Sequence, residues 1–169
     1  MKFKTVIING FGGVGKDTFV MECSRYAFTK NMSSVKRVME AEKLLGWTGR
    51  KDEKDRAFLC VLKDLCERDT DIRFQDMKSY FVWCRDHTTT EILFLHIREP
   101  EQIERAKEAF NATTVFIHRP GVKKIINNHA DAEVCDYTYD CYVVNDSSIE
   151  DLSKKAYEFV QWLREKDDV

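Results

Sequence analysis

The residues best placed to do chemistry lie near the start of the sequence, in the stretch VIINGFGGVGKDTF at residues 6–19. Gly10, Gly15 and Lys16 have the spacing of a G-x-x-x-x-G-K phosphate-binding loop (P-loop). Such a loop turns successive backbone N–H groups inward, and its lysine reaches the terminal phosphates of a nucleoside triphosphate. The stretch follows an apolar run and precedes a helical pattern, which is the context that a P-loop requires.

The same glycines permit a second interpretation. With Gly12 added, they also make G-x-G-x-x-G, the fingerprint of dinucleotide-binding folds. A dinucleotide fold needs an acidic residue about 20 residues past the loop, where it binds the ribose hydroxyls, and residues 31–39 contain none. The basic pair Lys36 and Arg37 keeps an NADP-binding protein as an alternative, although a dinucleotide fingerprint has no use for the lysine.

The P-loop interpretation predicts ATP and Mg²⁺ at this end of the chain. The residue after the lysine is ordinarily a serine or threonine that holds magnesium, whereas this chain has Asp17 followed by Thr18. Asp17 suits the positive end of a helix and could hold magnesium through water, so both residues are candidate metal ligands. The loop residues predicted to bind ATP are Gly10, Gly12, Gly13, Val14, Gly15, Lys16, Asp17 and Thr18.

The surrounding pattern predicts an α/β protein with a parallel sheet. Short β-branched runs without polar alternation indicate strands that are buried on both faces. They lie at Lys4–Asn9, Ile92–Ile97, Thr114–His118 and Cys141–Asn145, with a weaker one near Met32–Val35. Helical segments alternate with these runs, as expected for crossovers on both faces of the sheet.

Start signals place the helices. One is expected from Lys16 to about Lys30, and another begins at Pro100, a residue favoured in the first turn. The last helix follows a capping box made by Ser147 and Glu150. Between the weak second strand and the third, helical periodicity recurs at 36–45, 53–68 and 72–86, which indicates a helical insertion.

Composition and charge exclude several classes of protein. With 169 residues, of which 43% are apolar and 33% charged, the chain suits one globular domain, residues 1–169. Its net charge of -2 gives no basic excess for a nucleic acid partner, and no run approaches the ~20 apolar residues of a membrane span. The six cysteines form no C-x-x-C pair and no signal peptide is evident, so we expect reduced thiols in a cytoplasmic protein.

On these features the chain resembles the nucleoside monophosphate kinases of the P-loop class, above all phage and bacterial deoxynucleoside monophosphate kinases with a GKDT-type loop. The stretch YDCYVVNDSSIEDL is similar to the fifth strand and adenine-side loop of that group. The resemblance implies a three-layer P-loop kinase fold with a five-stranded parallel sheet ordered 2-3-1-4-5. It also implies an acceptor-binding insertion at about 36–90, a short lid at about 119–138, and an ATP contact from Asn145.

Phosphoryl transfer requires two anions held in line and positive charge around the transferred group. Arg98 and Arg119 each follow a predicted strand, at the edge where a parallel sheet binds its ligand. We predict that Arg98 binds the acceptor phosphate, that Arg119 binds ATP, and that both act in catalysis with Lys16. By contrast, His96 stands where P-loop proteins usually carry a magnesium-orienting aspartate.

Candidates for the acceptor lie in and before the insertion. Trp47 offers a ring for base stacking, and Arg50 and Arg56 offer cations for a phosphate. Ser33 and Ser34 are further acceptor-side candidates.

The sequence therefore predicts an ATP- and Mg²⁺-dependent kinase that phosphorylates a (deoxy)nucleoside monophosphate, with no nucleic acid and no membrane as partner. One alternative is a P-loop protein that binds nucleotide with little catalysis, which the histidine in place of the aspartate favours. The other is the NADP-binding protein. The acceptor stays open, because animal-type phosphomevalonate kinases also carry a Gly-Lys-Asp loop.

Overall fold

The computed structural model describes residues 2–47, 50, 52–122 and 137–166, without the side chains of Arg56 and Asp69. The strands are β1 (Lys4–Asn9), β2 (Thr29–Ser33), β3 (Ile92–His96), β4 (Thr113–His118) and β5 (Cys141–Val144). The helices are α1 (Lys16–Cys23), α2 (Lys36–Leu44), α3 (Glu53–Asp69), α4 (Ile72–His87), α5 (Pro100–Phe110) and α7 (Ile149–Glu165).

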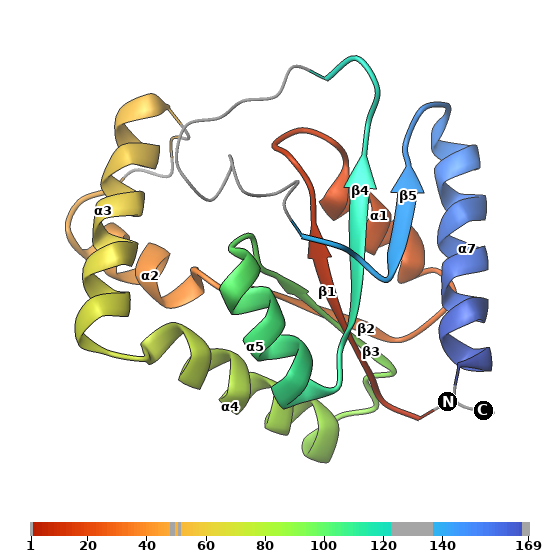
Figure 1. The fold of residues 1–169 in the computed structure, drawn as a ribbon, viewed down its shortest axis with the longest axis horizontal. Helices are drawn as coiled ribbons and strands as arrows, with labels where there is room; N and C mark the ends of the chain where they lie inside the picture. Colours follow the sequence, from red (N-terminus) through yellow and green to blue (C-terminus); the bar gives the residue numbers. More distant parts are fainter. Residues whose placement is uncertain (1, 48–49, 51, 123–136, 167–169) are drawn as a thin grey trace.

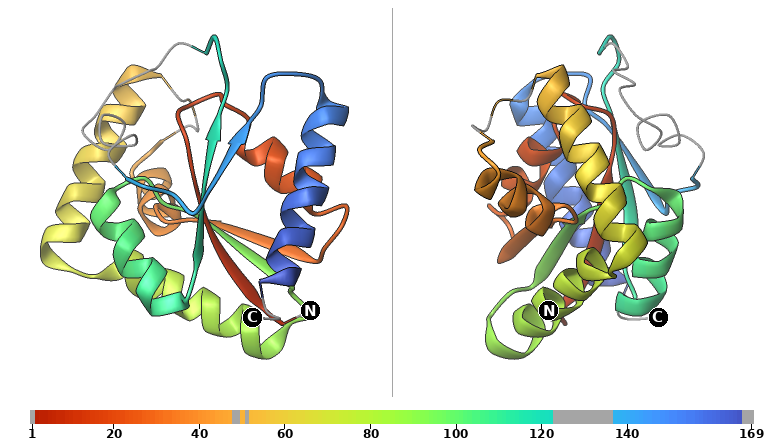
Figure 2. Two further views of the ribbon diagram at one scale, coloured as in Figure 1. Left: turned by 45° about the vertical axis from the view of Figure 1, so that its right-hand side comes forward. Right: turned by 90° about the vertical axis from the view of Figure 1, so that its left-hand side faces the viewer.

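The strands form one parallel sheet in the order β2-β3-β1-β4-β5. This order confirms the predicted α/β fold with the 2-3-1-4-5 sheet. Helices α1 and α7 pack together on one face of the sheet, and α4 and α5 cover the other (Figures 1 and 2). The central strands are buried on both faces, which explains their apolar sequences.

The strand register brings distant parts of the chain together at the carboxyl edge of the sheet. His96, at the end of β3, pairs with Ser33 of β2 and with Ile8 of β1. The segments that follow β1, β2 and β3 therefore leave the sheet next to one another. Ligands of open parallel sheets bind at this edge.

Three helices lie between β2 and β3, where the helical periodicity predicted them. In Figure 1, α3 stands apart from the sheet with α2 beside it, while α4 runs along the sheet next to α5. Phe74 and Phe81 of α4 stack on Phe110 of α5, with ring centres 5.6 and 4.9 Å apart. Among the described residues, no helix is both long enough and apolar enough to cross a bilayer.

Two predicted boundaries differ from the structure. Helix α1 ends at Cys23, well before Lys30, and β2 begins at Thr29, earlier than the strand expected near Met32–Val35. The carbonyl of Phe28 accepts hydrogen bonds from two backbone N–H groups at the start of β3, at 2.8 and 3.2 Å. Pairing with β3 thus overrides the helical propensity of this segment.

The amino-terminal cap of α7 is displaced by one residue from its predicted position. Ser148, not Ser147, is the capping residue, and its hydroxyl accepts a hydrogen bond from the backbone N–H of Asp151 at 3.3 Å. The two serines are adjacent and each has an acidic residue three positions later, so only the path of the backbone decides which of them caps the helix.

We predict that Ser148→Ala lowers the free energy of unfolding by about 1 kcal/mol, because it removes the hydroxyl that satisfies a first-turn N–H group. Ser147→Ala is the matched control and should change it by less than about 0.5 kcal/mol. Urea denaturation of both variants tests this, and equal losses from the two would contradict the capping role of Ser148.

Candidate functional site

The P-loop joins β1 to α1, and its glycines are required by its backbone and its neighbours. Gly10, Gly13 and Gly15 have φ angles of 144°, 78° and 95°, a range that residues with a side chain rarely adopt. A Cβ atom on Gly10 would lie 2.4 Å from the carbonyl oxygen of Ile117 in β4. One on Gly15 would lie 2.6 Å from Nδ2 of Asn145. The loop is therefore shaped by close contact with the segments around it.

Asn145 braces the P-loop from the end of β5. Its buried side-chain amide donates a hydrogen bond to the carbonyl of Val14 at 2.9 Å. Its backbone N–H donates to the carbonyl of His118 at 2.7 Å. The position of Asn145 is thus fixed by the loop that it supports.

Asn9 connects the P-loop to two other segments. This fully buried residue accepts a hydrogen bond from the N–H of Gly10 at 2.8 Å through Oδ1. Its Nδ2 donates to the hydroxyl of Tyr139 at 2.7 Å and to the carbonyl of Arg98 at 3.2 Å. One amide thereby fixes the start of the P-loop relative to the segment that follows β3.

Lys16 is folded back over its own loop. Its ammonium donates hydrogen bonds to the carbonyls of Gly10 and Phe11, at 2.6 and 2.8 Å. These carbonyls are neutral acceptors, and the oxygens of a phosphate are charged and bind an ammonium more strongly. The contacts of Lys16 are therefore of a kind that a bound phosphate can replace.

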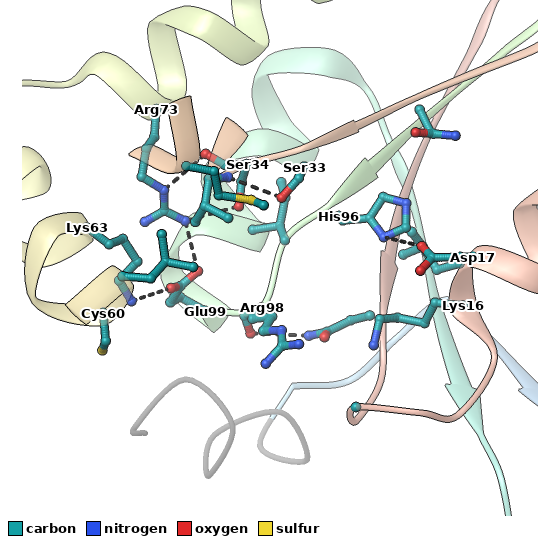
Figure 3. A pocket seen from close by; sticks show the side chains of 18 of the residues that line it. Lys16, Asp17, Ser33, Ser34, Cys60, Lys63, Arg73, His96, Arg98 and Glu99 are labelled. Atoms are coloured by element: carbon teal, nitrogen blue, oxygen red, sulfur yellow. Dashed lines mark hydrogen bonds and ion pairs between the residues drawn. The ribbon is translucent and has the colours of Figure 1, made fainter. Parts of the chain in front are cut away.

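A cavity of about 610 Å³ extends from the P-loop to the insertion helices (Figure 3). Lys16 and Asp17 lie at one end, and Ser34, Lys63 and Arg73 at the other. This volume is in the range of pockets that bind small molecules. The P-loop and the helices between β2 and β3 therefore share one binding space.

A buried ion network lies at the end of the cavity away from the P-loop (Figure 3). Arg73 of α4, whose side chain is 3% exposed, pairs with Glu67 at 2.7 Å and with Glu99 at 3.2 Å. It also donates a hydrogen bond to the hydroxyl of Ser34 at 3.1 Å. Lys63 of α3 pairs with the second oxygen of Glu99 at 2.8 Å. Helices α3 and α4 are thus both tied to the carboxyl edge of the sheet.

Glu99 is ionised in this network. Burial by itself raises the pKa of Glu99, but the charges of Arg73 and Lys63 outweigh it and lower the pKa to about 2. The carboxylate therefore keeps its negative charge throughout the neutral pH range.

Trp47 contributes an aromatic ring whose edge is held in place. Its Nε1–H donates hydrogen bonds to the carbonyl of Arg50 at 3.0 Å and to the carboxylate of Asp55 at 2.9 Å. The ammonium of Lys43 lies 5.9 Å from a ring centre. Since Trp47 and Arg50 both line the cavity, this wall can stack a planar base next to a cation.

His96 lies at the P-loop end of the cavity, where its Nδ1 is 3.9 Å from the carboxylate of Asp17 (Figure 3). Burial lowers the pKa of His96; Asp17 opposes this shift, and the charges of Lys16 and Arg98 add to it. The imidazole is therefore neutral at pH 7. It cannot replace the negative charge of an aspartate at this position.

Within the described ranges, no group of three or more His, Cys, Asp or Glu side chains is arranged to hold a metal ion. Asp17, whose side chain is 97% exposed, and Thr18 provide a carboxylate and a hydroxyl at the start of α1. Mg²⁺ usually takes one or two protein oxygens and completes its shell with phosphates and water. This donor set fits a magnesium ion that arrives with a nucleotide, and His96 adds no oxygen to it.

The cavity gathers many of the residues singled out from the sequence. Those that line it are Gly12, Gly13, Lys16, Asp17, Ser33, Ser34, Trp47, Arg50 and Arg98. Others lie in or near the P-loop but outside this lining, namely Gly10, Val14, Gly15, Thr18, Asn145 and the exposed Arg119. Arg56 belongs to α3, but its side chain lies outside what the structure describes. Most of the predicted lid, at 123–136, also lies outside the described residues.

Sequence reasoning missed Asn9, Lys63 and Arg73. A signal for Lys63 exists, because it follows Leu59 and Cys60 by one helical turn and shares the face of α3 that lines the cavity. Nothing in the sequence distinguishes Arg73 or Asn9, since their partners lie far along the chain.

No protein-family model and no curated protein matches the sequence. Its fold is similar to those of solved kinases. A sugar kinase from Janibacter sp. HTCC2649 has a TM-score of 0.57 at 10% identity, over 94% of this chain and 95% of that chain. A protein from Chloroflexus aurantiacus described as a kinase has a TM-score of 0.51 at 10% identity, over 98% of both chains. At such identities the likeness is one of fold, and it agrees with a P-loop kinase arrangement.

We predict that Gly15→Ala lowers the free energy of unfolding by at least about 2 kcal/mol, since it combines an unfavourable positive φ with a clash against Asn145. Gly12→Ala is the control from the same loop, because a Cβ there meets nothing within 4 Å. Thermal and urea denaturation compare the two. A Gly15 variant as stable as the Gly12 variant would show that the loop does not need this backbone conformation.

Proposed function

We propose that this protein is an ATP-dependent small-molecule kinase that transfers the γ-phosphate to a (deoxy)nucleoside monophosphate. The observation that carries the proposal is the cavity, which joins a P-loop lysine to a wall of cations, hydroxyls and a fixed indole ring. Cations outnumber carboxylates among its lining side chains, which suits two anionic substrates. The fold shared with solved kinases supports a phosphotransferase.

The P-loop is the donor end in this proposal. Its amide groups and the amino-terminal end of α1 bind the phosphates of ATP, and Lys16 leaves the carbonyls of Gly10 and Phe11 for the β- and γ-phosphates. Asp17 and Thr18 would hold Mg²⁺, which neutralises phosphate charge when bound. Arg119 and Asn145 complete the predicted ATP contacts.

The insertion and the end of β3 are the acceptor end. Arg98 receives the acceptor phosphate and, with Lys16, supplies positive charge on either side of the transferred group. Ser33 and Ser34 offer hydroxyl donors near that phosphate. The ring of Trp47 stacks on the base, and Arg50 and Arg56 add positive charge around it. A phosphate acceptor needs no general base, so the neutral His96 is no obstacle to transfer.

The domain organisation belongs to the same proposal. We assign residues 1–169 to one kinase domain, residues 36–90 to an acceptor-binding insertion, and residues 119–138 to a short lid, in a cytoplasmic protein. The burial of α4 against α5 and the ion network at Glu99 support an insertion that is anchored to the sheet at one end.

One observation favours a second candidate, a nucleotide-binding protein with little turnover. His96 occupies the place of the usual aspartate, so magnesium has fewer oxygen partners than in an ordinary P-loop enzyme. Such a protein would bind MgATP and transfer its phosphate to no acceptor.

Two assays test the proposal. Isothermal titration with MgATP and with NADPH distinguishes a P-loop protein from an NADP-binding one, and binding of NADPH alone would overturn the proposal. A coupled assay of ADP release over a panel of ribo- and deoxynucleoside monophosphates then identifies the acceptor. MgATP binding without any phosphorylated product would favour the second candidate.

We expect Lys16→Ala to reduce transfer at least about hundredfold, because it removes a charged donor from the transferred group. The fold should be unchanged, since Lys16 is only partly buried and its ammonium bonds to carbonyls of its own loop. Lys154→Ala, on the outer face of α7, is the control. Full activity in the Lys16 variant, measured as initial rate, would exclude the P-loop assignment.

Arg98→Ala should raise the KM for the acceptor about ten- to hundredfold, with a much smaller change in the KM for ATP. The reason is the loss of a charged hydrogen bond to the acceptor phosphate. Steady-state kinetics with each substrate varied in turn measure the split, with Arg85→Ala at the exposed end of α4 as the control. A larger rise in the KM for ATP than in the KM for the acceptor would contradict this role and assign Arg98 to ATP binding.

A further inference from the structure

The acceptor end of the cavity contains a carboxylate where an anionic substrate is proposed to bind. Glu99 lines the cavity and is ionised, with a side chain only 15% exposed. A buried charge at such a place is costly unless it is paired. Its partners are therefore part of how this end of the cavity receives a substrate.

Glu99 engages two of the cations that line the cavity. One carboxylate oxygen lies 2.8 Å from Nζ of Lys63, and the other lies 3.2 Å from Nη2 of Arg73. Lys63, whose side chain is 8% exposed, also lies 3.4 Å from Asp64, and Arg73 also pairs with Glu67. Carboxylates of the chain itself thus compensate both cations.

Arg98 is placed differently, although it precedes Glu99 in the sequence. In the view of Figure 3 its side chain lies between the Lys63–Glu99 pair and Lys16. Its backbone carbonyl is fixed to Asn9 at 3.2 Å, and Asn9 also holds the first glycine of the P-loop. The position of Arg98 is therefore set relative to the donor end of the cavity.

We propose that Glu99 is a specificity-determining residue, which holds Lys63 and Arg73 away from the substrate so that Arg98 binds an acceptor with one phosphoryl group. The proposal rests on the kinase function proposed above and concerns its acceptor site. A second phosphoryl group would extend toward a carboxylate that repels it and toward cations that are already paired. The chain would thereby favour monophosphates over diphosphates.

The test uses two inert probes, methylphosphonate with one phosphoryl group and methylenediphosphonate with two. Saturating ADP occupies the P-loop, and phosphorus NMR titration measures weak binding without turnover. In the wild type, methylenediphosphonate should bind no more tightly than methylphosphonate despite its larger charge. In Glu99→Gln, which keeps the size of the side chain and removes its charge, methylenediphosphonate should bind at least about tenfold more tightly.

Two further variants separate charge from shape. Glu99→Asp keeps the negative charge but shortens the side chain, and it should retain the wild-type ratio of affinities. Glu101→Gln removes an exposed charge from the first turn of α5 and is the matched control. A purely structural role predicts the reverse, with the isosteric Gln variant close to wild type and the Asp variant disturbed.

Several outcomes would overturn the proposal. They are tenfold tighter binding of methylenediphosphonate by the wild type, an unchanged ratio in a folded Glu99→Gln variant, or no binding of either probe. If circular dichroism shows that Glu99→Gln is unfolded, the ratio of the two probe affinities in the wild type and in Glu99→Asp still tests the proposal. Transfer assays test the kinase function separately. If the protein transfers phosphate but its two probe affinities do not have the expected ratio, only the role of Glu99 is refuted. If the affinities have the expected ratio but no phosphate is transferred to any acceptor, only the kinase function is refuted.

Discussion

The hydrogen bonds of one buried amide, that of Asn9, hold together the segments on which this site depends. They join Gly10 at the start of the P-loop, the backbone of Arg98 after β3, and the hydroxyl of Tyr139 before β5. A buried amide must find partners for both of its ends, so these segments cannot shift independently without leaving a polar group unsatisfied. The distance between the donor and acceptor ends of the cavity is thereby constrained.

Charge pairing shapes the other end of the cavity. Helices α3 and α4 meet there the residue that precedes α5, through the ion pairs of Lys63 and Arg73 with Glu99. A buried ion pair contributes little net stability, because removing the charges from water costs about as much as their attraction returns. The more important effect is geometric: the network fixes Ser34 through Arg73 and anchors the insertion helices to the edge of the sheet. The site is thus held by the neutral hydrogen bonds of Asn9 near the P-loop and by the ion pairs of Glu99 at the far end.

Most of the architecture could be predicted from the sequence. Periodicity located the strands at 4–9 and 92–96 and the helices at 53–69 and 72–87 to within a residue. Its errors fall where a contact with a distant segment overrides a local signal, as at 24–35, where pairing with β3 overrides helical propensity. The site was predicted less completely, because charged residues on a helix look alike until their partners are known.

The sequence by itself determined the P-loop, because the spacing of Gly10, Gly15 and Lys16 is a local requirement of backbone angles and reach. It also determined the order of strands and helices, through patterns within short windows. Only the tertiary structure decided that Asn9 holds Arg98 and that Glu99 pairs with Lys63 and Arg73. Those contacts join residues far apart in the chain, and the register of a parallel sheet, which no local pattern encodes, brings them to one edge.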